Sequence, residues 1–187
     1  MKRITMILGM VAIAASTLFV SCAKKHEPVH VTAFPRERAA TYALNQKGEY
    51  AWSTTSTDKW SSADNRYTGF RTDYRPTELA DNEILFYMAP NSSWTATISG
   101  VSKNYIKFRT YTGGEGFYNP EKHPTTYEVS GERGTQEELC IVVTQTPDFG
   151  EDPFVAHIYL TMDGQTMPLA NITIGPKAEE VEEDVEE

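Results

Sequence analysis

The feature that most constrains the fold is a succession of short β-type runs, separated by turn residues, that extends from about Asn82 to Ile174. Apolar and polar residues alternate in 94–98 and 105–109, as they do in strands that bury one face. The run 139–145 is rich in β-branched residues, which favour strands. No stretch combines sustained helical periodicity with capping residues, and a spacing of roughly 8 to 15 residues between runs is typical of a sandwich. The sequence therefore predicts an all-β fold.

Further runs complete the predicted strands, at 83–89, 127–129, 154–162 and 165–174. Asp163-Gly164 separates the last two runs, and this dipeptide between apolar runs is a strong hairpin signal. Pro168 has no N–H to donate to a neighbouring strand, so it predicts that the final run is an edge strand or carries a bulge.

The segment 39–80 is harder to interpret, because it is rich in Ser, Thr and Asp and yet carries seven aromatic residues. That is too many for an ordinary linker. Short strands at 49–53 and 66–70 are predicted. Whether the segment joins the sandwich or forms a separate unit stays open at this stage.

The N-terminus has the composition of a targeting segment. Lys2 and Arg3 precede an apolar stretch, 4–20, which is slightly short for a spanning helix of roughly 20 residues. The stretch ends at Ser21-Cys22. This arrangement resembles the signal peptide of bacterial lipoproteins, and the Ser-Cys junction is similar to those of the Bacteroidota.

The resemblance implies cleavage after residue 21 and lipidation of Cys22. Bacterial lipoproteins carry two or three acyl chains on this cysteine, and two chains suffice for stable anchoring where one is marginal. Phe19 departs from the pattern, since Leu is commoner at its position. An uncleaved membrane anchor and cleavage by ordinary signal peptidase near Ala23 are the alternatives.

Charge and proline content define the two ends of the mature chain. Residues 22–38 are charged and proline-bearing without an apolar period, so we predict a tether there. The tail, 177–187, holds seven of the negative charges in its last ten residues and is predicted to be a solvated, disordered segment. The chain as a whole has a net charge of −9, and no basic stripe exists to neutralise phosphates. Nucleic acid is therefore excluded as a partner.

With Cys22 lipidated, Cys140 has no partner for a disulfide. Its strand-like surroundings predict a small buried hydrophobe rather than a nucleophile. His26 and His30 have helical i,i+4 spacing, but Pro28 between them argues against a helix that could present both to a metal. We predict no metal site and no cofactor.

Enzyme signatures are missing from the sequence: there is no nucleophile elbow, zincin motif, phosphate-binding loop or Cys-x-x-Cys pair. His157 shares a strand face with Val155 and Tyr159, where a hydrogen-bonded structural histidine is predicted. Asp148 and Glu151 are predicted to flank a turn; acid-base catalysis would need them at a cleft with separated pKa values. The chain is predicted not to be an enzyme, and a hydrolase with an unrecognised site is the weakest alternative.

Three segments resemble the BACON-type modules of Bacteroidota lipoproteins and glycan-degrading enzymes. They are Ala89 to Gly100 with its tryptophan Trp94, the Gly113-Gly114-Glu115-Gly116 loop and the run Ile141-Val142-Val143-Thr144-Gln145. The match covers 80–146 and implies an immunoglobulin-like antiparallel β-sandwich, with 81–176 as the module. Two features depart from the family: 105–108 replaces a common second Trp-Leu pair, and the hairpin 154–174 extends beyond the expected end. Independently of the family, Trp94 is explained as a core aromatic.

Two interpretations of the aromatic residues in 39–80 remain open. Trp52, Trp60, Tyr67 and Tyr74 lie among hydroxyl and amide side chains, a combination that commonly binds sugars. The simpler interpretation is that they cover an edge of the sandwich.

These observations predict a lipid-anchored, non-enzymatic envelope protein whose sandwich is a binding or assembly module, with a protein or a glycan as partner. A glycan-binding lipoprotein accessory to polysaccharide capture is the alternative. The lipid would hold the chain on the bacterial outer membrane. Lys24-Lys25 lacks the acidic signal common after the cysteine of surface-exported lipoproteins, which favours the periplasmic face without excluding the surface.

Overall fold

The computed structural model describes residues 34–54, 68–71, 79–88, 90, 92–111, 124–133 and 137–180. The chain divides into two units, Met1–His30 and Val31–Glu187, and every described residue belongs to the second. The predicted leader 1–21, the tether as far as residue 33 and the tail from residue 181 lie outside the described residues, as does Cys22. No helix among the described residues is long and apolar enough to cross a membrane.

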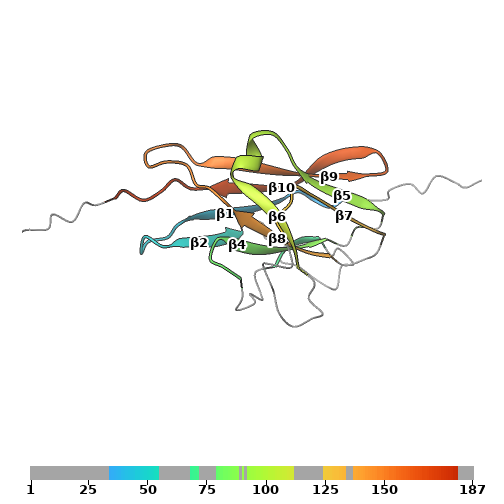
Figure 1. Ribbon diagram of the computed structural model, residues 1–187, viewed down its shortest axis with the longest axis horizontal. Helices are drawn as coiled ribbons and strands as arrows, with labels where there is room; N and C mark the ends of the chain where they lie inside the picture. The colour runs from blue at the N-terminus through green and yellow to red at the C-terminus, as the bar shows by residue number, and fades with distance from the viewer. Residues whose placement is uncertain are drawn as a thin grey trace, which may run out of the picture. The chain divides into compact units, whose positions relative to one another are not determined.

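The described strands form two sheets (Figure 1). The six-stranded sheet has the order β2-β1-β10-β9-β5-β7 and the four-stranded sheet the order β3-β4-β8-β6. The strands of the first sheet are β1 (Arg38–Leu44), β2 (Tyr50–Thr54), β5 (Trp94–Ile98), β7 (Glu128–Gly131), β9 (Phe154–Met162) and β10 (Gln165–Ile174). Those of the second are β3 (Gly69–Arg71), β4 (Glu83–Met88), β6 (Ile106–Tyr111) and β8 (Glu137–Val143).

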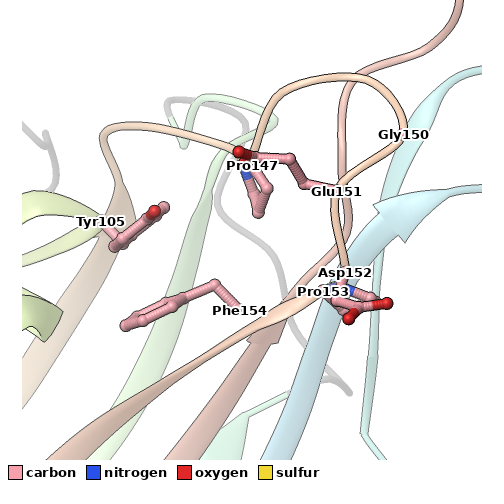
Figure 2. A pocket seen from close by; sticks show the side chains of 7 residues that line it. All are labelled: Tyr105, Pro147, Gly150, Glu151, Asp152, Pro153 and Phe154. Atoms are coloured by element: carbon pink, nitrogen blue, oxygen red, sulfur yellow. The ribbon is translucent and has the colours of Figure 1, made fainter.

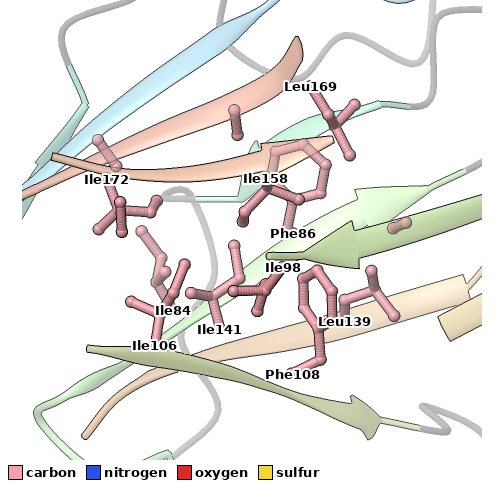
Figure 3. Packing of buried hydrophobic residues seen from close by; sticks show 14 of the residues in the cluster. Ile84, Phe86, Ile98, Ile106, Phe108, Leu139, Ile141, Ile158, Leu169 and Ile172 are labelled. Carbon is pink, nitrogen blue, oxygen red and sulfur yellow. The ribbon is translucent and has the colours of Figure 1, made fainter. Parts of the chain in front are cut away.

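The core lies between the two sheets and follows from the alternation seen in the sequence. In β9 and β5 every second residue is buried, as expected for strands with one face on a core. Figure 3 shows the inward side chains of both sheets packed together. They include Ile98, Ile158 and Ile172 from the larger sheet and Ile84, Phe86, Phe108 and Ile141 from the smaller one. The predicted all-β sandwich is confirmed.

One strand pairing departs from the antiparallel prediction. β1 pairs in parallel with β10, from Arg38 opposite Ala170 to Tyr42 opposite Ile174, and antiparallel with β2. β3 pairs with β4 in the other sheet. The described parts of 39–80 therefore contribute strands to both sheets. β1 already begins at Arg38, the last residue of the predicted tether, and Phe34 packs against the core.

The hairpin between β9 and β10 forms as predicted. Met162 pairs with Gln165, so the loop is the two residues Asp163 and Gly164, both with positive φ, 47° and 75°. Positive φ at both positions is the requirement of a type I′ turn. The register shifts between Pro168 and Ala170. β10 lies inside its sheet, so of the two alternatives for the proline, the bulge holds.

Trp94 occupies the core position predicted for it and is 2 % exposed. Gly131 stands opposite it in the β5–β7 pair. A Cβ on Gly131 would lie 2.5 Å from Cζ2 of the indole. The glycine is therefore required by packing, because its missing side chain makes room for the tryptophan ring.

Candidate functional site

The most developed surface feature lies where β5, β8 and β10 end and β6 and β9 begin. We call it the loop end and define it by three segments: Gly100–Asn104 (the 3₁₀ helix η2) with Tyr105, residues 144–154, and residues 175–177. The parallel pairing of β1 with β10 means that β1 runs toward this end. The chain leading from residue 34 therefore enters the sandwich on the opposite side.

Backbone hydrogen bonds tie the three segments together. Thr144 N–H donates to the Tyr105 carbonyl at 2.7 Å, and Lys177 N–H donates to the Pro147 carbonyl at 3.0 Å. The Tyr50 hydroxyl donates to the Pro176 carbonyl at 3.0 Å. The loop end is thus held in place by the strands behind it rather than left as independent loops.

A tight turn forms the outer part of the loop end. Glu151 N–H donates to the Asp148 carbonyl at 3.1 Å, and the Glu151 carboxylate accepts from Asp148 N–H at 3.0 Å. Gly150 supplies the positive φ of 82° that the turn needs. The predicted turn with flanking carboxylates is present. One carboxylate caps its own turn, which gives the pair a structural task.

Lys177 fastens this turn to the end of β10. Its Nζ lies 2.7 Å from Oδ1 of Asp148, and the hydrogen bond and charge of Asp148 raise the pKa of Lys177. Both side chains are exposed, so the pair adds little to the free energy of unfolding. Its effect is to neutralise one carboxylate of the turn.

Beneath the turn lies an open depression of about 580 Å³ (Figure 2). Tyr105 and Phe154 form one wall, with their rings stacked at 3.9 Å between centroids and 15° between planes. The other lining residues are Pro147, Gly150, Glu151, Asp152 and Pro153. Apolar rings beside carboxylates can hold a ligand that has an apolar part next to a hydroxyl or cationic group.

Exposed large hydrophobic side chains are more frequent in and next to the segments of the loop end than elsewhere among the described residues, although none of them lines the depression. Of the four among the described residues, Phe149 is 59 % exposed, Val101 62 % and Val155 39 %, and all three lie at or directly beside the loop end. The fourth, Met167, is 39 % exposed and lies near the start of β10, at the other end of the sheet. Single exposed hydrophobics are ordinary, whereas a cluster marks a contact surface.

The charge around the depression is negative. The loop end together with residues 178–180 contains five carboxylates and two basic residues, Lys103 and Lys177. The carboxylates belong to Asp148, Glu151, Asp152, Glu179 and Glu180. The loop end therefore combines apolar contact area with a field that attracts cations.

His157 has the hydrogen-bonded structural role predicted for it. Its Nδ1 lies 2.6 Å from the amide oxygen of Asn171, and the Asn171 amide donates to the Glu37 carboxylate at 2.6 Å. Its backbone N–H donates to Ser102 Oγ at 3.0 Å, which joins η2 to β9. The imidazole is on the exposed face of the larger sheet with Val155 and Tyr159.

Cys140 is a buried hydrophobe, as predicted. It is fully buried on the face of the smaller sheet that points away from the main core, in a cluster with Leu79, Leu85 and Val142. On this face the Arg109 guanidinium donates to the Glu83 carboxylate at 2.6 Å. No group of three or more metal-ligating side chains occurs in the part of the chain that the structure describes.

Among the four aromatic residues weighed as a sugar platform, only Trp52 belongs to the described residues. Its indole N–H donates to the Asp81 carbonyl at 3.0 Å, and its ring lies 4.9 Å from that of Tyr42. This placement agrees with the edge-covering interpretation. Trp60, Tyr67 and Tyr74 lie outside the described residues, as do His26 and His30.

The sequence interpretation missed Tyr105, Phe149 and Phe154 as members of one site. Tyr105 and Phe154 are 49 positions apart and meet only through the pairing of sheets. The available local signal was Phe149 itself, an aromatic residue inside a turn between two carboxylates.

Comparison with known proteins places the chain in no family: no family model matches it, and no curated protein shows significant similarity.

Proposed function

We propose that this chain is a lipid-anchored, non-enzymatic protein of the bacterial cell envelope whose β-sandwich is a binding or assembly module. The observation that carries the binding role is the loop end, where an open depression is lined by the stacked rings of Tyr105 and Phe154 and where Phe149 and Val101 are exposed. Hydrogen bonds from three segments hold that surface in a fixed shape. A preformed surface binds with a smaller loss of conformational entropy than a mobile one.

Palmitate labelling tests the anchor. Radiolabelled palmitate should enter the wild-type chain in its bacterial host and be missing from Cys22→Ala, because only the thiol can carry the acyl chains. A matched variant, Cys140→Ala, should keep the label. Label retained by Cys22→Ala would refute lipidation at this residue.

A second candidate is glycan binding, favoured by one observation at the loop end. The Tyr105–Phe154 pair lies beside the carboxylates of Glu151 and Asp152, and sugars are bound by aromatic faces next to polar acceptors. Pull-down of the purified chain on insoluble polysaccharides tests this candidate. Retention that is lost in Phe154→Ala and kept in Met167→Ser would support it.

A further inference from the structure

The chemistry of the loop end also indicates what kind of partner it accepts. The apolar lining of its depression is the stacked Tyr105–Phe154 pair with Pro147 and Pro153, and Phe149 is exposed in the adjoining turn. Aromatic and aliphatic side chains gathered at a preformed depression are typical anchor sites for a side chain of a protein partner.

The carboxylates of the loop end also constrain the charge of the partner. Asp148 is neutralised by Lys177, and Glu151 accepts a backbone hydrogen bond of its turn. Asp152 is exposed and lines the depression, and Glu179 and Glu180 follow Lys177 along the chain. An anionic partner would be repelled by this field, whereas a cationic one would be drawn to it.

From this combination we infer that the loop end docks a polypeptide segment in which an aromatic or large aliphatic side chain is flanked by Lys or Arg. The apolar side chain enters the depression beside Phe154, and the flanking cations lie against Asp152, Glu179 and Glu180. This inference rests on the binding role proposed above and names the partner of that site.

Two short peptides of opposite charge separate apolar from electrostatic recognition. N-acetyl-Lys-Trp-Lys-amide and N-acetyl-Glu-Trp-Glu-amide are titrated to millimolar concentration into the ¹⁵N-labelled chain from residue 22 carrying Cys22→Ser, with amide shifts as the readout. The Lys peptide should shift the amides of Tyr105, Gly150, Glu151 and Phe154 in a saturable manner. The Glu peptide should bind about tenfold more weakly or not at all, and raising the salt from 20 to about 300 mM should reduce the difference.

Variants locate the binding. Phe149→Ser should weaken binding of the Lys peptide about fivefold, since aromatic anchors dominate small interfaces. Asp152→Asn should weaken binding of this peptide without abolishing it. Met167→Ser removes an equally apolar, exposed side chain away from the loop end and should leave binding unchanged. None of these residues is buried, so the fold should be retained in each variant.

Two results would overturn the inference. One is that the two peptides shift the loop-end amides equally, or that neither peptide shifts them. The other is saturable binding of a neutral oligosaccharide such as cellohexaose at the same amides without binding of the Lys peptide. That second result would leave the proposed binding module standing with a glycan as its partner, whereas the absence of localised shifts with any probe would count against the binding role itself.

Discussion

At the scale of single residues, the pair Trp94 and Gly131 shows how one position depends on another. The indole fills the space that a side chain at Gly131 would take, and its N–H donates to no acceptor among the described residues. A buried unpaired donor costs about 1–3 kcal/mol, so the ring must recover this by the apolar area it buries. The tryptophan is explained by packing, with no ligand required.

Gly131→Ala should therefore lower the free energy of unfolding by about 1–3 kcal/mol, because overpacking forces the indole or the strand to move. Urea denaturation measures the effect. Glu128→Gln, at an exposed position of the same strand, serves as a control and should change stability by no more than about 0.5 kcal/mol. In a Trp94→Leu background the cost of Gly131→Ala should fall; the same cost in both backgrounds would contradict the proposed clash.

At the scale of elements, β2 illustrates how an edge strand is fastened. β2 is an outer strand of the larger sheet, and its inward aromatics, Tyr50 and Trp52, pack on Tyr42 of β1. Tyr50 and Trp52 also donate hydrogen bonds to backbone carbonyls outside the strand. These contacts fix an edge strand that main-chain pairing on one side alone would hold weakly.

Trp52→Ala is expected to lower the free energy of unfolding by about 2 kcal/mol, which is less than for a fully buried tryptophan. Trp52→Phe keeps an aromatic ring against Tyr42 and loses the bond to Asp81, at a cost of about 1 kcal/mol. Thermal and urea unfolding measure both variants, with Ser53→Ala as the outward-facing control. Unchanged stability of Trp52→Ala together with lost polysaccharide retention would instead support a sugar-binding role for this residue.

The strands that the sequence predicted correctly share a local signal. β5, β6 and β9 alternate, and the β9–β10 turn has a dipeptide that tolerates positive φ. β1 lacked such a signal because its small residues, Ala39 and Ala40, differ little in hydropathy between the two faces. It also begins within a segment whose prolines and charges predicted a tether.

At the scale of the whole molecule, the sandwich is not complete within 81–176. β1 covers the edge of β10 and contributes Ala40 and Tyr42 to the core, and β3 contributes Phe70. Without these strands, β10 would expose an unpaired edge and part of the core would face water. The stable unit therefore includes β1, β2 and β3, the described strands of the segment whose status the sequence left open.

A chain of residues 34–180 should unfold cooperatively on heating, while a chain of residues 81–176 should be unfolded or aggregated. Circular dichroism and gel filtration distinguish the two outcomes. Adding a peptide of residues 34–54 in excess to the shorter chain tests whether β1 and β2 are the missing part. A monomeric, cooperatively folding 81–176 chain would show that the first three strands are dispensable.

The sequence by itself determined the all-β class, most strand positions, the last hairpin, and the buried state of Trp94 and Cys140, and it limited Pro168 to an edge strand or a bulge. These follow from alternation, turn chemistry and residue polarity, which act over a few neighbouring residues. Only the tertiary structure decided the parallel pairing of β1 with β10 and the meeting of Tyr105, Phe154 and the Asp148–Glu151 turn at one end. Those contacts join residues far apart in the chain, and their geometry depends on how the two sheets close over a shared core.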